Sequence, residues 1–408
     1  MILPVQEPLI KQFTRTLFDE GITSSIKVLE KAQSIVIKKL SSGFLKIMSY
    51  GNRLKIILNP YKKEIPLEQY ENFSEVRNWK TASIRFIAFH PHCFRIAVAS
   101  VDDSIRIYSN DNSVITLLKN AQQKSIFALA FRPYNFSTLV VGCSSGILIW
   151  TIDPNSNMTR PLSQAVLCRH ENHFPVTSLE FNHSGNLLAT SSINDTSILI
   201  WDIDKNTCVP LRRFSVPFLK LQWSLNGSYL FSSTVGNVFR VWDCEKFKSD
   251  RWTIAGGHIQ SFQWSPCAKF LLFVTSKDPV LYCLGFADEP LFSKSKEDIH
   301  RALPVADLSK ITTEHKESGG IAQQLTWNGK YLAISFKETN TIATFQTTVR
   351  QHQLHILPMF FICGQGAAEF PSFITFQPFY KDNSSNSLID HVLTIGWSSG
   401  RVQFYPFV

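Results

Sequence analysis

From residue 84 onward, short stretches of alternating apolar and polar residues recur along the chain, and each stretch ends in Phe or Trp. A Pro or a Ser-x-Gly turn usually follows the aromatic residue within a few positions. Alternation with a period of two is typical of β-strands that bury one face. The aromatic residues that close the seven stretches are Phe89, Phe131, Phe181, Trp223, Trp264, Trp327 and Phe376.

A second signal follows each of the first six aromatic residues after 18 to 20 positions, and it is a β-branched run that closes on another aromatic residue. In the seventh copy a longer loop, 381–390, delays this run to 403–405. Small residues and a turn with Gly, Asp or Asn lie between the two signals, which indicates hairpins. Each repeat therefore predicts three hairpin-linked strands and a more polar outer strand, such as 208–211.

Four strands per repeat at this spacing resemble the WD40 family, and seven copies close a ring. We therefore predict an all-β fold, a seven-bladed WD40-type β-propeller over residues 79–408. The namesake dipeptide occurs in only two copies, at Trp201-Asp202 and Trp242-Asp243. Gly257-His258 is the one readable Gly-His start, and its own copy lacks the Asp. We therefore expect the His-Asp hydrogen-bond network of a standard blade to be incomplete.

A long insertion separates the fifth and sixth copies, between Ala287 and Gly320. It is mostly polar and has too few apolar residues to pack as a blade of its own. We expect it to protrude from the ring and to be cut first by a protease.

Residues 1–78 form a separate N-terminal segment in which the strand period is lost. Between residues 22 and 47 apolar residues recur at intervals of three, four or seven, which predicts a short helical segment with lysines on its other sides. Two interpretations remain: a helical cap docked on the propeller, or a basic amphipathic surface for acidic lipid or an acidic partner. The candidate contact residues for the second interpretation are Lys38, Lys39, Lys46 and Lys55.

The last repeat ends without residues for an outer strand, so the N-terminal segment is a candidate to supply that strand. Residues 2–5 and 54–58 both read as short strands. We favour the first, which would attach the helical segment to the ring at both ends.

Charge does not indicate a nucleic-acid groove. The net charge is +9, but nine basic residues and one acid between Lys27 and Lys63 account for +8 of it, so the remaining fold is close to neutral. A phosphate-binding surface would spread its charge over the fold, and we expect no direct contact with nucleic acid. No apolar run reaches the roughly 18 residues of a membrane-spanning helix, and no secretory signal is visible.

The chemistry-bearing residues favour structure over catalysis or metal binding. The eight cysteines contain no C-x-x-C pair, so we expect buried or half-buried free thiols in a reducing compartment, with no metal and no cofactor. Gly142-Cys143-Ser144-Ser145-Gly146 fits the nucleophile-elbow motif, but a strand follows it where that chemistry needs a helix. The segment His90–Cys93 and the residues Asp102, Asp103 and Asp195 occupy predicted turns. We expect a turn in the first case and backbone capping in the second.

Several short sequence segments are more specific than the general WD40 pattern, and they resemble the aladin family of WD-repeat nucleoporins. They are residues 89–92, 101–108, 146–154, 207–211 and 394–401. The resemblance implies a non-catalytic scaffold subunit of the nuclear pore complex at the nuclear envelope. Its partners would be other nucleoporins, including a transmembrane nucleoporin that holds it at the pore membrane, in support of nucleocytoplasmic transport. The 32 Phe include no Phe-Gly dipeptide, so the chain does not belong to the disordered barrier class.

A second functional interpretation stays open on the sequence. A propeller can also read peptides, as a ubiquitin-ligase substrate receptor or a histone reader does. Acidic or aromatic residues around the mouth of the central channel would favour that reading, and their placement depends on the tertiary structure.

Overall fold

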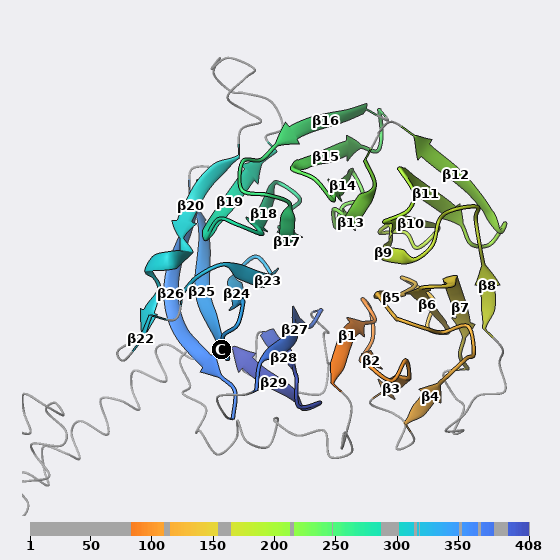
Figure 1. Ribbon diagram of the computed structural model, residues 1–408, viewed down its shortest axis with the longest axis horizontal. Coiled ribbons are helices and arrows are strands. Elements are labelled where there is room, and N and C mark those ends of the chain that lie inside the picture. Colours follow the sequence, from red (N-terminus) through yellow and green to blue (C-terminus); the bar gives the residue numbers. More distant parts are fainter. Residues whose placement is uncertain are drawn as a thin grey trace, which may run out of the picture. The chain divides into compact units, whose positions relative to one another are not determined.

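The computed structural model describes residues 83–407, apart from 110–114, 154–164, 213–215, 247, 287–301, 314–315, 318, 351–352, 366–368 and 379–390. These residues belong to one compact unit that spans Leu67–Ser385 and Ile389–Phe407. Within it, seven antiparallel sheets follow one another around a ring (Figure 1). The predicted seven-bladed all-β propeller is confirmed.

The first four blades are regular four-stranded meanders. Blade one contains β1 (Ile84–Phe89), β2 (Arg95–Ser100), β3 (Ile105–Ser109) and β4 (Thr116–Leu118). Blade two contains β5 (Ala128–Phe131), β6 (Thr138–Cys143), β7 (Gly146–Thr151) and β8 (Val166–Cys168). Blade three contains β9 (Val176–Phe181), β10 (Leu187–Ser192), β11 (Ser197–Asp202) and β12 (Thr207–Arg212). Blade four contains β13 (Phe218–Trp223), β14 (Tyr229–Thr234), β15 (Val238–Asp243) and β16 (Lys248–Thr253).

The last three blades differ more in the length of their strands. Blade five contains β17 (Ile259–Trp264), β18 (Phe270–Thr275), β19 (Val280–Gly285) and β20 (Leu303–Asp307). Blade six contains β23 (Ala322–Trp327), β24 (Tyr331–Phe336), β25 (Thr341–Arg350) and β26 (Gln353–Cys363). Blade seven has three described strands, β27 (Pro371–Phe376), β28 (His391–Trp397) and β29 (Val402–Phe407).

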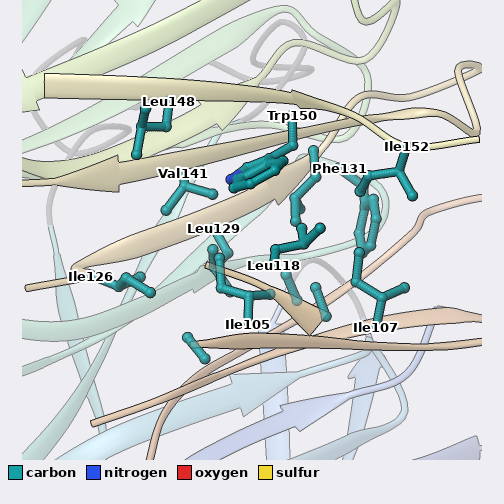
Figure 2. Packing of buried hydrophobic residues seen from close by; sticks show 14 of the residues in the cluster. Ile105, Ile107, Leu118, Ile126, Leu129, Phe131, Val141, Leu148, Trp150 and Ile152 are labelled. Carbon is teal, nitrogen blue, oxygen red and sulfur yellow. The ribbon is translucent and has the colours of Figure 1, made fainter. Parts of the chain in front are cut away.

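The apolar core lies between neighbouring sheets. Figure 2 shows Ile105 and Leu118 of blade one packed with Leu129, Phe131 and Trp150 in the same cluster of buried residues. Burial of a large side chain of this kind contributes about 1.5–3 kcal/mol. The aromatic residues that close the repeats therefore stabilise contacts between blades, because each sheet alone has two faces to cover.

The innermost strands are also joined by side-chain hydrogen bonds to the backbone of the next blade. Glu180 Oε2 accepts from the Trp223 amide at 2.8 Å, and Ser261 Oγ accepts from the Leu325 amide at 3.1 Å. Equivalent bonds run from the Leu221, Ile374 and Phe376 amides to Ser178, Gln324 and Thr326. These bonds satisfy edge amides that no neighbouring strand reaches.

The ring closes between blades seven and one. The rings of Phe86 and Phe373 lie 4.7 Å apart, and Ser83 Oγ donates to the Ser398 carbonyl at 2.8 Å. The predicted N-terminal helical segment, the two candidate closing strands and the boundary at residue 78 all lie outside the described residues, so they stay predictions. Within the part of the chain that the structure describes, no helix is long and apolar enough to cross a membrane.

The prediction that the whole insertion after blade five protrudes is wrong for its final part. Residues 303–307 form β20, the outer strand of blade five, and a 3-10 helix, η1 (Leu308–Lys310), follows. Leu308 is fully buried against apolar residues of blades five and six. The edge of β19 needs a hydrogen-bonding partner, and β20 supplies it. A few apolar residues are enough to hold so short a stretch against the blade. A two-stranded hairpin of β21 (Thr312–Thr313) and β22 (Lys316–Glu317) comes next.

Candidate interaction face

The meander topology gives the propeller two loop-bearing faces. The innermost strands β1, β5, β9, β13, β17, β23 and β27 all begin at one face, here called the N face, and end at the other, the C face. The hairpins between the second and third strands of each blade also lie on the N face. Loops that are far apart in sequence therefore form a common surface there, which is where a protein partner would meet several blades.

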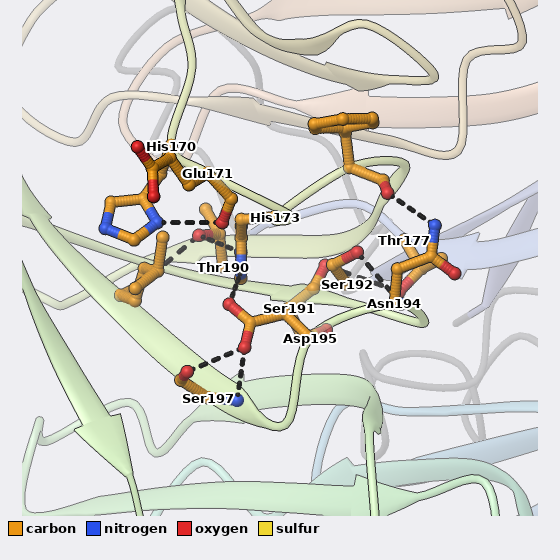
Figure 3. Close-up of polar contacts among 12 residues, drawn as sticks. His170, Glu171, His173, Thr177, Thr190, Ser191, Ser192, Asn194, Asp195 and Ser197 are labelled. Atoms are coloured by element: carbon orange, nitrogen blue, oxygen red, sulfur yellow. Dashed lines mark hydrogen bonds and ion pairs between the residues drawn. The ribbon is translucent and has the colours of Figure 1, made fainter.

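Blade three carries a complete buried polar network near the N face (Figure 3). His173 Nδ1 donates to Asp195 Oδ2 at 2.7 Å, and its Nε2 lies 3.0 Å from Thr190 Oγ1. Trp201 Nε1 donates to the same hydroxyl at 2.9 Å. Asp195 Oδ1 accepts from the Ser197 amide at 2.9 Å, so the network joins the loop before β9 to the hairpin between β10 and β11.

Burial sets the protonation of this network. It lowers the pKa of His173 and outweighs the opposing effect of the hydrogen bond to Asp195, so the imidazole stays neutral near pH 7. Burial alone would raise the pKa of Asp195, but hydrogen bonds from Ser197 and His173 hold it below its usual value. The pair is therefore a neutral imidazole beside a carboxylate, and because Asp195 can only accept, it fixes the imidazole proton on Nδ1.

The expectation that no blade completes this network is wrong for blade three. The sequence signal is hidden because Asn172, not Gly, precedes His173. Asn172 adopts a φ of 60°, the left-handed conformation that Gly supplies in the usual motif and that Asn tolerates better than most residues. Reading Asn-His as equivalent to Gly-His would have found the site.

Other blades replace the network with smaller substitutes. In blade two, Gln123 stands in the position of the His and accepts from Trp150 Nε1 at 2.9 Å. In blade four, Trp242 Nε1 donates to Ser232 Oγ at 2.9 Å. The network is therefore incomplete in these two blades, as expected, because one neutral polar side chain accepts the hydrogen bond of the indole N–H there.

Blade seven uses an ion pair in the same place. Arg401 NH2 lies 2.8 Å from Glu369 Oε2, and its Nε lies 3.1 Å from Oε1. Burial would raise the pKa of Glu369, but hydrogen bonds from Arg401, Ser399 and the Gln365 amide hold it at about 2. The pair ties the loop before β27 to the hairpin between β28 and β29.

The N face also exposes large apolar side chains from several blades. Phe174 is 44% exposed, and Val101 is 50% exposed. Among the described residues of the N-face loops and strand starts, such side chains are Val101, Phe127, Phe174, Ile193, Val216, Val235 and Phe370. Apolar side chains held on a rigid frame are suited to a protein contact.

Several residues were candidates for catalysis, metal binding or partner contact on the sequence alone. The turn expected at Ser144 is confirmed, because Cys143 pairs with Gly146 across the hairpin of β6 and β7. His90 is buried against Phe131 and Phe136, and Asp102 caps its turn by accepting from the Ser104 amide at 3.2 Å.

No group of three or more metal-ligating residues occurs in the described ranges. The candidate contacts Lys38, Lys39, Lys46 and Lys55 lie outside them.

The cysteines are free thiols, as expected, but not all of them are buried or half-buried. Burial raises the pKa of Cys244 and of Cys283 to about 12 in each case. Cys267 and Cys363 are exposed, which corrects the expectation that every thiol is at least half-buried. Both lie at the ends of strand or turn segments, where alternation alone does not settle which side faces solvent.

Seven meanders around a ring, with a His-Asp-Trp network in one blade, define a WD40-type β-propeller of the kind that acts through protein contacts. The model of the Aladin seven-bladed propeller family matches residues 67–408, and the chain belongs to that family. Family membership and the fold together support a non-catalytic WD scaffold role of the nucleoporin type.

Two characterised proteins show similarity to the sequence of this chain. The chain is 26% identical over 333 residues to Aladin of Arabidopsis thaliana, which covers 75% of this chain and 71% of that protein. It is 28% identical over 152 residues to the human F-box-like/WD repeat-containing protein TBL1X, over 35% of this chain and 25% of that protein.

Two solved structures share the fold. The β-propeller domain of Myceliophteria thermophila Cps50 (Swd1) matches with a TM-score of 0.59 at 15% identity, over 82% of this chain and 99% of that one. A chain of the Mitotic Checkpoint Complex matches with a TM-score of 0.60 at 14% identity, over 85% and 95%. At these identities the likeness concerns the fold alone.

Proposed function

We propose that the chain is a non-catalytic scaffold and adaptor subunit of the nuclear pore complex, docked at the pore membrane and supporting nucleocytoplasmic transport. The observation that carries this proposal is the match of the Aladin propeller model to residues 67–408, on a ring that is closed in the structure. Its partners are other nucleoporins, including a transmembrane nucleoporin of the pore membrane.

The docking is divided between two parts of the chain. The rigid propeller supplies specific protein contacts, because its loops carry exposed apolar side chains such as Phe174 and Phe370. The basic N-terminal segment assists through acidic lipid, at roughly 1 kcal/mol for each basic residue near the surface. Screening within about 8 Å at physiological salt keeps this second contribution secondary.

Localisation of the tagged full chain tests the proposal. A nuclear-rim signal that overlaps pore markers is expected, and a signal spread through chromatin would favour a peptide reader in its place. That second candidate rests on the partial similarity to TBL1X, which covers only 35% of this chain.

Charge reversal separates the two docking contributions. A variant with Lys38, Lys39, Lys46 and Lys55 replaced by Glu is expected to lose part of the rim signal. The matched control replaces the exposed lysines Lys205, Lys246, Lys248 and Lys310 by Glu, which changes the net charge equally. Complete loss of rim signal in the first variant, with the protein folded and abundant, would make the basic segment the anchor and overturn the ranking.

A further inference from the structure

A strained aromatic turn stands out on the C face of blade two, in the loop between β5 and β6. Tyr134 has a φ of 57°, a conformation that bulky side chains rarely adopt. In the corresponding C-face turns the positive-φ residue is Gly185 in blade three, Gly227 in blade four, Ala268 in blade five and Gly329 in blade six. Blade two therefore keeps a large ring where these blades use Gly or Ala, and the ring is 60% exposed. Retained strain of this kind points to a function.

Tyr134 lies at the centre of a ladder of rings that crosses three blades. The His92 ring stacks on it with centroids 4.1 Å apart, and the His183 ring meets it edge-on at 6.2 Å. Phe136, two residues along the same loop, is 51% exposed and stacks on the buried ring of His90 at 5.3 Å. We call His92, Tyr134, Phe136 and His183 the ring ladder.

Two arginines hold the ring ladder rigid. Arg95, which is buried, donates through NH1 to the carbonyl of Phe136. Arg132 donates through Nε to the Gly185 carbonyl at 2.8 Å and through NH1 to Asp204 Oδ1 at 2.7 Å. The loops of blades one, two and three are thereby joined, so a ligand would meet a preformed surface and would not have to order it.

These same bonds use up the hydrogen-bond acceptors around the ladder. The carbonyls of Phe136 and Gly185 and the carboxylate of Asp204 are engaged by arginines, and Asn135 Oδ1 accepts from the Ser137 amide at 3.0 Å. The ring atoms of His92, Tyr134 and His183, by contrast, make no hydrogen bond within the described residues. The surface therefore offers apolar ring faces together with phenol and imidazole N–H donors, and Asp204 neutralises the charge of Arg132 beside them.

We propose that the ring ladder binds an extended, proline-rich segment of a partner protein in the polyproline II conformation. Proline lacks a backbone N–H, so such a segment presents carbonyl acceptors and few donors, which complements the ladder. Its pyrrolidine rings pack on aromatic faces, and its preset backbone loses little entropy on binding. An acidic peptide fits less well, because Arg132 is already paired with Asp204 and Arg95 is buried. This inference concerns the chemistry of a partner and holds wherever in the cell the protein works.

Selection from phage-displayed peptides with purified full-length chain tests the proposal. One library has fixed Pro-x-x-Pro cores with randomised flanks, and the matched library has Ala in place of each Pro. Enrichment of the proline library is expected, and the best selected peptide is then measured by fluorescence polarisation. Tyr134→Gly is the informative variant, because Gly relieves the positive φ while it removes the ring. It should keep or raise the melting temperature and weaken binding at least about tenfold.

The controls distinguish specific binding at the ring ladder from nonspecific binding to any exposed apolar surface. Leu357→Ser removes an apolar side chain that is 55% exposed on the outer strand β26 of blade six, away from the ring ladder, and should leave binding unchanged. Equal enrichment of the alanine library, selection of acidic or helical sequences, or unchanged binding by Tyr134→Gly would each overturn the proposal. The measurement uses purified protein, so its failure is independent of where the tagged protein localises in cells.

Discussion

The guanidinium of Arg401 and the carboxylate of Glu369 face each other in a two-point contact on blade seven, at 2.8 and 3.1 Å. Both side chains are largely covered, at 14% and 11% exposed. Arg401 also lies over the Trp397 ring at 5.1 Å. The last blade is thereby fixed to its own entry loop in the region where the ring closes.

Arg401→Gln is expected to lower the free energy of unfolding by about 2 kcal/mol at pH 7, because it leaves a largely buried carboxylate short of its donors. The pKa of Glu369 in the folded state, about 2, lies below its ordinary value of 4.5, so this stabilisation is present above pH 4.5 and lost as the pH falls toward 2. Urea denaturation at pH 7 and pH 3 checks it. Lys205→Gln, in an exposed pair with Asp202, should leave stability nearly unchanged.

His173 is expected to make the propeller sensitive to mild acid. Its folded-state pKa lies below 6.5, so the unfolded chain takes up a proton that the folded chain resists, and stability falls as the pH drops below about 6.5. His173→Gln should flatten this dependence, because Gln123 already fills the equivalent position in blade two. Melting temperatures at pH 5 and pH 7.5 measure the effect. An unchanged slope in the variant would show that another group titrates.

Glu180 is expected to weaken the seam between blades three and four at neutral pH. Burial raises its pKa to about 8, so between about pH 4.5 and 8 the unfolded chain releases a proton that the folded chain keeps, and stability falls as the pH rises. Glu180→Gln retains an acceptor for the Trp223 amide and should be more stable than the parent chain at pH 8 but not at pH 4.5. Burial lowers the pKa of Lys220 to about 8, so its opposite effect is confined to higher pH. Equal stability of Glu180→Gln and the parent chain at pH 8 would contradict the seam argument.

Ser144→Ala is expected to leave the fold and every cellular phenotype unchanged. The hydroxyl makes an exposed hydrogen bond to the Lys124 carbonyl at 2.9 Å, and the Ser144 amide bonds to the same carbonyl. Loss of an exposed bond of this kind changes stability by about 0.5 kcal/mol or less. Complementation of a deletion strain tests the expectation, and loss of function in a stably folded variant would reopen the enzyme interpretation.

The repeat pattern determined the fold, because each strand is specified locally. A period of two, a closing aromatic residue and a Gly or Asp turn can all be read within about 40 residues, and the seven aromatic anchors each fall at the end of an innermost strand. The turn at Ser144 followed for the same reason, since a strand on both sides of a short loop makes a hairpin.

Only the tertiary structure decided which distant residues meet. Asp195 lies 22 residues from His173, Arg401 lies 32 from Glu369, and the seam bond from Trp223 to Glu180 spans 43. The ring ladder joins loops of three blades, and no local period relates Tyr134 to His183. The two pairs within one blade depend on how its entry loop folds back against its hairpin. The seam bond and the ring ladder depend on how neighbouring sheets are rotated around the ring, a geometry set by packing between whole blades.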